Sequence, residues 1–296
     1  MSERVHPGVR LREAMGRGVV AAPGAFNGLC ARAVMRAGFE ACYVSGAATS
    51  VCAGVPDVGL LTLEHFTRTV REVADGSGLP VLADADTGFG EAEMVRRTVV
   101  EYERAGGAGL HLEDQVFPKR CGHLDGKALV PMDHMCEKVE WAAKASRDCS
   151  GGAFIVCART DARGVEGLEA AVARAKAYVQ AGAEMIFPEG LTSEAEFAAF
   201  ARGVRSSGSK PFLLANMTEF GKTPMIPLAR FGEMGYDVVI YPVTLLRVAM
   251  GAVTRALVTL GREGSAESLL GEMQTRQELY GLIGYEPGKP WEWPVR

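Results

Sequence analysis

The segment FPKRCGHLDGK, residues 117–127, places a cysteine among cationic side chains. Lys119 and Arg120 directly precede Cys121, and His123 lies two residues after it. Nearby cations favour the thiolate, and a thiol with a labile proton can serve as a general acid. This spacing is not specific to one reaction, so a solvated loop without a role is the alternative. Residues 115–130 follow a strand-like run and show no periodicity of their own, which is typical of active-site lids.

Two aspartates separated by one residue, Asp84 and Asp86, end another strand-like run. Side chains two apart on an extended chain point to the same side, so both carboxylates can face one hard cation. Mg²⁺ prefers a few carboxylates together with water and substrate oxygens. The alternative is a turn at residues 86–88 that begins a helix. Glu113, which follows the next strand-like run, favours a metal-binding acidic cluster.

A single arginine, Arg159, stands near the end of the apolar run IVCARTD. A buried unpaired charge is costly, so this guanidinium needs an anion. Glu113, Glu189 or a substrate carboxylate could supply it, and a purely internal ion pair is the alternative to a substrate site. Asp161 is either a helix cap or a site residue. The stretch TGFG, residues 87–90, matches neither a phosphate loop nor a dinucleotide fingerprint, so we predict no nucleotide site.

A sequence pattern that occurs four times predicts the helices and strands that position these residues. Four times a helix-like stretch ends in a small residue and glycine and an apolar run follows, and the expected helix caps are Gly38, Gly106, Gly182 and Gly235. The apolar runs are continuous, as in a parallel sheet covered on both faces. Eight βα units are predicted, with strands in the segments 18–24, 36–46, 79–86, 104–114, 153–161, 180–190, 210–218 and 233–243. This pattern predicts an α/β fold, a (β/α)8 TIM-type barrel whose strand ends converge on one mouth.

The chain is predicted to form one barrel domain over residues 1–296, with a C-terminal helical extension over about 265–296. Residues 265–284 predict a further amphipathic helix, whose apolar stripe comprises Leu269, Leu270, Met273, Leu279, Leu282 and Ile283. Such a surplus helix either covers the base of the barrel or packs on another subunit.

Composition excludes several classes of protein. The formal net charge of −4 over 296 residues, without a block of Lys or Arg, argues against a nucleic-acid partner. The seven cysteines are scattered, which fits neither a disulfide framework nor a zinc site. No apolar run approaches the roughly 18 to 20 residues of a membrane span, and the amino terminus is charged. We therefore expect a cytoplasmic protein with no membrane partner.

Several motifs together resemble the isocitrate lyase and phosphoenolpyruvate mutase superfamily. They are KRCGH (119–123), YVSG (43–46), GVPDVG (54–59), DADTGFG (84–90), HLEDQ (111–115), ARTDA (158–162), FPE (187–189), NMTEFG (216–221) and TRQELY (275–280). The resemblance implies Mg²⁺, with Mn²⁺ as a substitute, and retro-aldol cleavage of a polycarboxylate, 2-methylisocitrate, to pyruvate and succinate in the methylcitrate cycle of propionate catabolism. It also implies a homotetramer, a dimer of dimers whose C-terminal helices are exchanged between subunits.

The resemblance also implies roles for the matching residues. Asp84 and Asp86 would hold the metal, with Asp57 and Glu113 supporting it through water. The implied catalytic residues are Cys121 and His123, and Tyr43 is the first candidate for the base. The implied substrate-binding residues are Ser45, Gly46, Ala47, Gly122, Arg159, Glu189, Asn216, Thr218, Arg247 and Arg276.

Three departures from the family pattern bear on the substrate. Ala47 stands where close relatives commonly have glycine, which adds a methyl group near the bound carboxylate. The loop continues as LDGK, a form that also resembles relatives acting on 2,3-dimethylmalate or carboxyphosphonoenolpyruvate. Isocitrate lyases proper carry a large insertion that this sequence lacks. The alternatives are therefore a 2,3-dimethylmalate lyase, a carboxyphosphonoenolpyruvate phosphonomutase-like enzyme, and a non-enzymatic barrel that binds a dicarboxylate.

Overall fold

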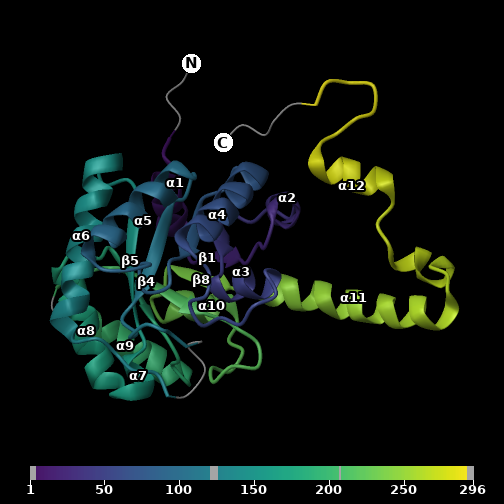
Figure 1. Cartoon of the computed structure of the whole chain (residues 1–296). Helices are drawn as coiled ribbons and strands as arrows, with labels where there is room; N and C mark the ends of the chain where they lie inside the picture. The colour runs from purple at the N-terminus through teal and green to yellow at the C-terminus, as the bar shows by residue number, and fades with distance from the viewer. Residues whose placement is uncertain (1–4, 121–125, 207, 292–296) are drawn as a thin grey trace.

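A barrel of eight parallel strands forms the centre of the computed structural model, which describes residues 5–120, 126–206 and 208–291 (Figure 1). The strands are β1 Val20–Pro23, β2 Cys42–Val44, β3 Val81–Asp84, β4 Gly109–Glu113, β5 Ile155–Thr160, β6 Met185–Pro188, β7 Phe212–Asn216 and β8 Val238–Tyr241. Neighbours in the chain pair from β2 to β8, and β8 pairs with β1. A parallel bridge between Gly24 and Tyr43 joins β1 to β2 and closes the ring. The predicted (β/α)8 fold is confirmed.

Helices lie outside this ring. They are α1 Pro7–Arg17, α2 Gly28–Arg36, α3 Gly46–Cys52, α4 Leu63–Ser77, α5 Ala92–Arg104, α6 Met132–Ser150, α7 Ala162–Val165, α8 Leu168–Gln180, α9 Glu194–Arg205, α10 Leu228–Glu233, α11 Thr244–Glu263, the 3-10 helix η1 Glu267–Glu272, and α12 Arg276–Ile283. The four predicted cap glycines lie one residue beyond the caps, at φ values between +84 and +111 that glycine adopts without steric cost, and they are Gly38, Gly106, Gly182 and Gly235.

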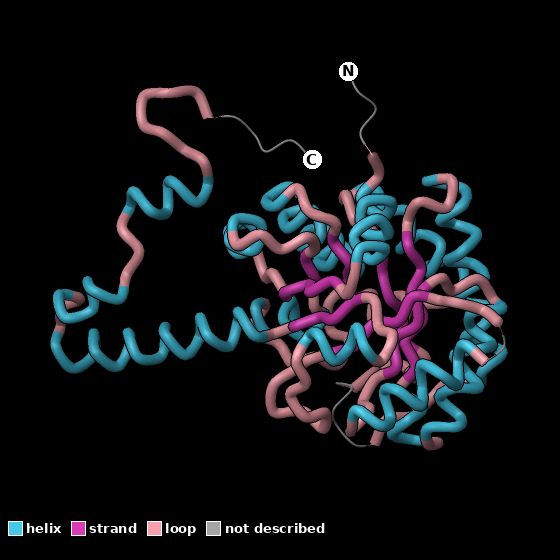
Figure 2. Tube along the Cα trace, turned by 180° about the vertical axis from the view of Figure 1, so that it is seen from behind, coloured by secondary structure: helices cyan, strands magenta, loops and turns pink. Residues whose placement is uncertain are grey.

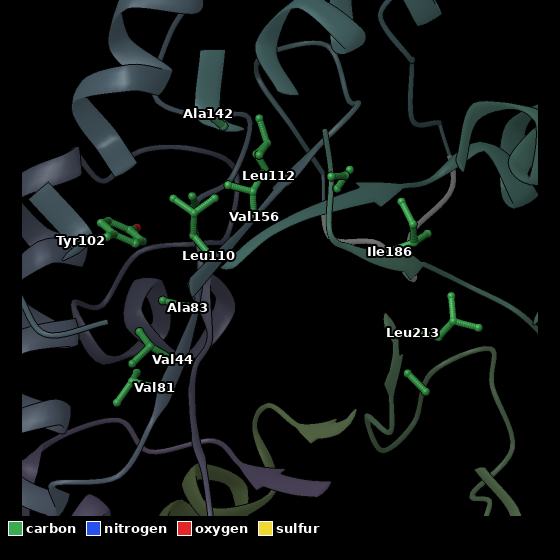
Figure 3. Close-up of a cluster of buried hydrophobic side chains, with 14 of the residues drawn as sticks. Val44, Val81, Ala83, Tyr102, Leu110, Leu112, Ala142, Val156, Ile186 and Leu213 are labelled. Carbon is green, nitrogen blue, oxygen red and sulfur yellow. The ribbon is translucent and has the colours of Figure 1, made fainter. Parts of the chain in front are cut away.

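Side chains alternate between two cores along each strand. In β4, Leu110 and Leu112 pack against the helices, whereas His111 and Glu113 point into the barrel. Figure 3 shows the outer layer, with Leu110 and Leu112 beside helical residues such as Ala142. This alternation is the reason that the inward series of each strand can end in a polar residue at the barrel mouth while the outward series stays apolar.

Helix α1 closes the other end of the barrel. Leu11 and Met15 belong to the cluster of side chains inside it. Gly8 packs so closely against the chain before β5 that a Cβ there would lie 2.1 Å from the carbonyl oxygen of Ala153. Since the amino ends of the strands are covered, the carboxyl ends form the accessible mouth.

The C-terminal segment is an arm that leaves the barrel. Helix α11 projects away from the strands, and the chain then turns back through η1 to α12 (Figures 1 and 2). Within α11, all of which the structure describes, Leu246 is the buried residue. The extension thus begins with the helix after β8 and not at residue 265.

Two expectations about the C-terminal segment are corrected. Residues 265–284 do not form one helix: Met273 is extended, and Thr275 with Glu278 forms a capping box that starts α12 anew. Of the predicted apolar stripe, Leu269 is buried, while Leu270 is 64% exposed.

Helix α11 is also long and apolar enough, by length and composition alone, to cross a membrane, although the sequence showed no uninterrupted apolar run of that length.

Candidate active site

Polar side chains from three neighbouring strands meet at the mouth. Asp84 ends β3, Glu113 ends β4, and Arg159 stands one residue before the end of β5. The strand register pairs Glu113 with Arg159 directly, and all three side chains belong to buried residues. The structure therefore brings these predicted site residues together at one end of the barrel.

Arg159 is the central cation of this cluster. Its Nη1 lies 3.1 Å from Glu113 Oε2, its Nε donates to Asp161 Oδ2 at 3.0 Å, and its Nη2 lies 3.6 Å from Glu189 Oε2. Burial lowers the pKa of the guanidinium, but the three carboxylates outweigh burial and hold that pKa above its ordinary value. The internal ion pair considered from the sequence exists, and it fixes a permanent positive charge at the mouth.

Glu189 links β6 to β7 at the same mouth. Its Oε1 accepts a hydrogen bond from the Gly190 backbone N–H at 2.8 Å, and its Oε2 accepts one from Asn216 Nδ2 at 3.1 Å. Thr218 is buried two residues after Asn216. Glu189 thus joins Arg159 to Asn216.

The predicted metal residues Asp84 and Asp86 lie in one turn, which we call the acidic turn, and two backbone N–H groups donate hydrogen bonds to Asp84 within it. Asp84 accepts from the backbone N–H of Gly46 at Oδ2 and from that of Asp86 at Oδ1, both at 3.0 Å. Burial raises the pKa of Asp84, but His111, Lys119 and Arg159 outweigh it and lower that pKa, whereas burial raises the pKa of Asp86 to about 6. A Cβ at Gly46 would lie 2.7 Å from Asp84 Oδ2, so this position requires glycine.

Lys119 lies in the acidic turn and not in solvent. Its ammonium group pairs with Asp57 Oδ1 and lies 2.8 Å from Asp86 Oδ1, with 3% of the side chain exposed. Burial lowers the pKa of Lys119, but Glu113 and the aspartates raise it above its ordinary value. The sequence identified Lys119 as a cation near the thiol, and its contact with both acids was missed because a loop has no periodicity from which to read side-chain direction.

The charges at the mouth leave an excess of carboxylates among the described residues. The acids are Asp57, Asp84, Asp86, Glu113, Asp161 and Glu189, and the cations are Lys119, Lys127 and Arg159. Both carboxylate oxygens of buried Glu113 lack a hydrogen bond within the described chain, and burial raises its pKa well above the ordinary value. A further cation near Glu113, in addition to Arg159 at 3.1 Å, would lower that pKa and give the carboxylate oxygens a second partner.

The same residues limit how a metal could bind. In the ranges 5–120, 126–206 and 208–291, no group of three or more His, Cys, Asp or Glu side chains is placed to hold a metal ion directly. The mouth therefore fits a cation that takes one or two carboxylates directly and completes its shell with water and substrate oxygens. Mg²⁺ binds in this way.

Tyr43 and His111 form a buried pair beneath the acids. Tyr43 Oη lies 2.8 Å from His111 Nε2, and His111 Nδ1 lies 3.7 Å from Asp84 Oδ1. Burial raises the pKa of Tyr43 well above its ordinary value and lowers the pKa of His111 to about 4. His111 was not named from the sequence, although its inward position in GLHLED between two outward leucines was a usable signal.

Ser45, Gly46 and Ala47 begin helix α3. Ser45 Oγ caps the helix by accepting from the Ala48 backbone N–H at 3.2 Å, and Ala47 is half-buried. The Gly46 N–H is bonded to Asp84. Gly46 thus joins the start of α3 to the turn of Asp84 and Asp86.

A second set of buried contacts supports the cluster. Lys127 Nζ donates to Asp161 Oδ1 at 2.7 Å, so Asp161 binds both Lys127 and Arg159. Asp114 Oδ1 accepts from the Asp161 backbone N–H at 2.9 Å, and Asp114 Oδ2 accepts from Thr160 Oγ1 at 2.7 Å. Asp161 stands at the N-cap position of α7, one of the two alternatives from the sequence, but its side chain makes no capping hydrogen bond and pairs with Arg159 and Lys127 instead.

Two further predicted substrate residues, Arg247 and Arg276, lie in the C-terminal helices α11 and α12. Arg247 Nη1 donates to the carbonyl oxygen of Glu219 at 2.6 Å, and its guanidinium lies over the ring of Phe220. Arg276 begins α12, where Arg36, the last residue of α2, donates to the carbonyl oxygen of Gly281. The last residue of a barrel helix lies near the amino ends of the strands, so α11 and α12 do not bring Arg276 to the mouth of its own barrel.

Three predicted residues cannot be placed. Cys121, Gly122 and His123 lie outside the described residues, and their roles stay predictions. Their neighbours on both sides are described: Lys119 binds the acidic turn and Lys127 binds Asp161.

Comparison with known proteins agrees with this geometry. The family model described as phosphoenolpyruvate phosphomutase matches residues 11–260. A Corynebacterium glutamicum protein named "Probable 2-methylisocitrate lyase 1" is 52% identical over 264 residues, covering 89% of this chain and 84% of that protein.

Two solved structures are similar over almost the whole chain. A crystal structure of 2,3-dimethylmalate lyase has a TM-score of 0.86 at 38% identity and covers 95% of this chain and 93% of its own. A complex of phosphonopyruvate hydrolase with oxalate and Mg²⁺ has a TM-score of 0.80 at 28% identity and covers 95% of each chain.

Proposed function

The chain belongs to the phosphoenolpyruvate phosphomutase family of enzymes, and on that premise we propose that it is a carbon–carbon lyase that cleaves 2-methylisocitrate to pyruvate and succinate. The observation that carries the proposal is the meeting, at one mouth, of an acidic turn suited to a metal with Arg159, Glu189 and Asn216, which suit a polycarboxylate. The relative that is 52% identical and is named "Probable 2-methylisocitrate lyase 1" supports the choice of substrate.

We propose Mg²⁺ as the cofactor, with Mn²⁺ as a substitute. Asp84 and Asp86 would hold it, and Asp57 and Glu113 would support it through water. When bound, the ion supplies Lewis-acid polarisation of the substrate hydroxyl and its adjacent carboxylate. The Mg²⁺ in the phosphonopyruvate hydrolase complex supports this assignment.

Tyr43 is the proposed base for the substrate hydroxyl. A phenol with a raised pKa is a weak acceptor by itself, but His111 Nε2 lies 2.8 Å from Tyr43 Oη. If His111 carries its proton on Nδ1, it can accept the phenolic proton as Tyr43 Oη takes the proton of the substrate. This pair thus removes a proton without leaving a charge on Tyr43.

The arginine cluster is proposed to stabilise the second product. Cleavage of the carbon–carbon bond leaves negative charge on the succinate half, and Arg159 with Asn216 would hold its carboxylate. Cys121 would then protonate the carbon as a general acid, with Gly122 and His123 beside it in the sequence. Ser45, Gly46, Ala47 and Thr218 would bind the carboxylates of the substrate.

A second candidate substrate is 2,3-dimethylmalate. The similar crystal structure of a lyase for that compound and the LDGK continuation of the loop both favour it. A phosphonomutase reaction has the description of the family model in its favour.

The test is release of the 2-oxoacid product with Mg²⁺, measured side by side as pyruvate from 2-methylisocitrate and 2,3-dimethylmalate and as glyoxylate from isocitrate. We expect the highest kcat/KM for 2-methylisocitrate. A higher kcat/KM for 2,3-dimethylmalate would replace the substrate and keep the reaction type. No release of ketoacid from any of the three would overturn the lyase assignment.

The arm is proposed to join subunits into a homotetramer, a dimer of dimers. Helix α11 exposes Leu257 and Val258, each at 63%, over a helix with little burial of its own. A second copy could cover this face, and exchange of arms would bring Arg276 to another subunit. Arg255 lies in the middle of α11, where a bilayer would disfavour its charge by about 3 kcal/mol, so we propose a protein partner for this helix and no membrane partner. We also propose that the protein is a cytoplasmic enzyme of propionate catabolism.

A further inference from the structure

The ammonium group of Lys119 occupies a position between two proposed metal-supporting carboxylates. It pairs with Asp57 Oδ1 and lies 2.8 Å from Asp86 Oδ1, and 3% of the side chain is exposed. Asp86 Oδ1 has no hydrogen bond of good geometry among the described residues, so the ion pair with Lys119 is its main electrostatic contact there. Lys119 thus provides the positive charge that the acidic turn requires.

Neighbouring contacts hold Lys119 in this place. The side chain of Gln115 bonds the Arg120 backbone twice, with Nε2 donating to the carbonyl oxygen and Oε1 accepting from the N–H, both at 2.9 Å. The ring of Phe117 packs on Gly59, where a Cβ would lie 2.5 Å from the ring. The Phe117 ring thus joins this segment to the loop that carries Asp57, while Gln115 holds the conformation of the segment itself.

Two cations cannot share these oxygens without strong repulsion. Mg²⁺ binds a carboxylate oxygen at about 2.0–2.1 Å, so an ammonium group in contact with the same oxygen would lie within about 5 Å of the ion. Like charges that close in a buried site repel strongly, because the low dielectric barely screens them.

We propose that Lys119 is a built-in counter-ion of the metal site, which occupies the cation position in the metal-free protein and is displaced from Asp86 when a divalent metal binds. Lys119 thereby sets the metal affinity of the site as a positioning residue. The inference rests on the proposed function only in placing the metal at Asp84 and Asp86. The proposal predicts that the site binds Mg²⁺ more weakly than the same carboxylates would without Lys119.

Calorimetric titration with Mg²⁺ alone, without substrate, tests the inference. Lys119→Met removes the charge and keeps most of the volume, so we expect its Mg²⁺ affinity to rise at least about tenfold. Lys119→Arg keeps the charge and should bind Mg²⁺ as the wild type does. Lys127→Met is the matched control, because Lys127 is a lysine of the same mouth that pairs with Asp161. An affinity of Lys119→Met equal to or below that of the wild type would overturn the proposal.

Chemical labelling of the wild-type protein gives an answer that does not depend on the variant folding. Acetic anhydride should acetylate Lys119 slowly without metal and several-fold faster with saturating Mg²⁺, as read by mass spectrometry of the peptide. Protection of Lys119 that is equal with and without bound Mg²⁺ would refute displacement. A protein that binds Mg²⁺ and exposes Lys119 but releases no pyruvate would instead refute the proposed function alone.

Discussion

At the scale of single residues, the mouth is a set of buried charges that each depend on a partner. Asp161 shows this most clearly, since it is fully buried and binds both Arg159 and Lys127. Burial raises the pKa of Asp161, but these two cations outweigh burial and lower that pKa below its ordinary value. Its ionised form therefore stabilises the fold.

Asp161→Asn should lower the free energy of unfolding at pH 7 by about 3 kcal/mol, because it leaves two buried cations short of a partner. The folded-state pKa of Asp161 is below its unfolded value, so this contribution is complete above about pH 4 and is lost as the pH falls further. In urea unfolding, the difference in unfolding free energy between the wild type and Asp161→Asn should become smaller from pH 7 to pH 3. Asp148→Asn, which alters an exposed pair with Lys144, is the control and should change stability little. A difference in unfolding free energy that stays constant with pH would contradict the pairing of ionised Asp161 with Arg159 and Lys127.

Gly46→Ala tests the contact between α3 and the acidic turn. Because the added Cβ would lie 2.7 Å from Asp84 Oδ2, the carboxylate must shift. A displacement of this size at a reacting centre costs about 100-fold in kcat/KM. Gly16→Ala in α1 is the control, since a Cβ at Gly16 meets no atom within 4 Å. The measurement is kcat/KM for both variants by steady-state kinetics. A kcat/KM of Gly46→Ala equal to that of the wild type would mean that the turn of Asp84 and Asp86 does not serve the reaction.

At the scale of elements, strand periodicity explains what could be predicted. Asp84, Glu113 and Arg159 were identifiable because each ends an apolar run in a barrel whose strands all point the same way. The pairing of Lys119 with Asp57 was not, because both residues lie in loops whose path depends on contacts such as Phe117 on Gly59. Local sequence patterns do not encode such contacts.

Gln115→Ala tests the segment that leads to Cys121. Loss of its two hydrogen bonds to the Arg120 backbone should reduce kcat by about tenfold while unfolding free energy falls by about 1–2 kcal/mol. Gln115→Glu keeps the acceptor and loses the donor, so its kcat should be intermediate. Gln277→Ala, in α12, is the control for a glutamine outside the barrel. A kcat for Gln115→Ala equal to that of the wild type would show that this support is dispensable.

At the scale of the whole molecule, the arm was the least predictable part. An amphipathic or apolar helix has the same sequence pattern whether it covers its own barrel or a neighbouring one, so the departure of α11 could not be inferred from periodicity. The break between η1 and α12 is set by the Thr275 capping box, which has a recognisable signature in TRQE that the stripe of apolar residues obscured.

Leu257→Glu tests assembly through the arm. A charge on the exposed apolar face of α11 should dissociate the proposed tetramer, and light scattering should report the mass of smaller species. Val165→Glu, which changes a residue of α7 that is 45% exposed, should leave the mass unchanged. A Leu257→Glu protein with the wild-type mass would exclude this face as the interface.

The most direct measurement of the whole account is pyruvate release from 2-methylisocitrate by the wild type and by Asp84→Ala, each with Mg²⁺ and with a chelator. We predict release by the wild type that depends on Mg²⁺, and no release by Asp84→Ala under either condition. Asp148→Ala should behave as the wild type. Activity in Asp84→Ala that Mg²⁺ still stimulates would contradict the placement of metal and substrate at this mouth.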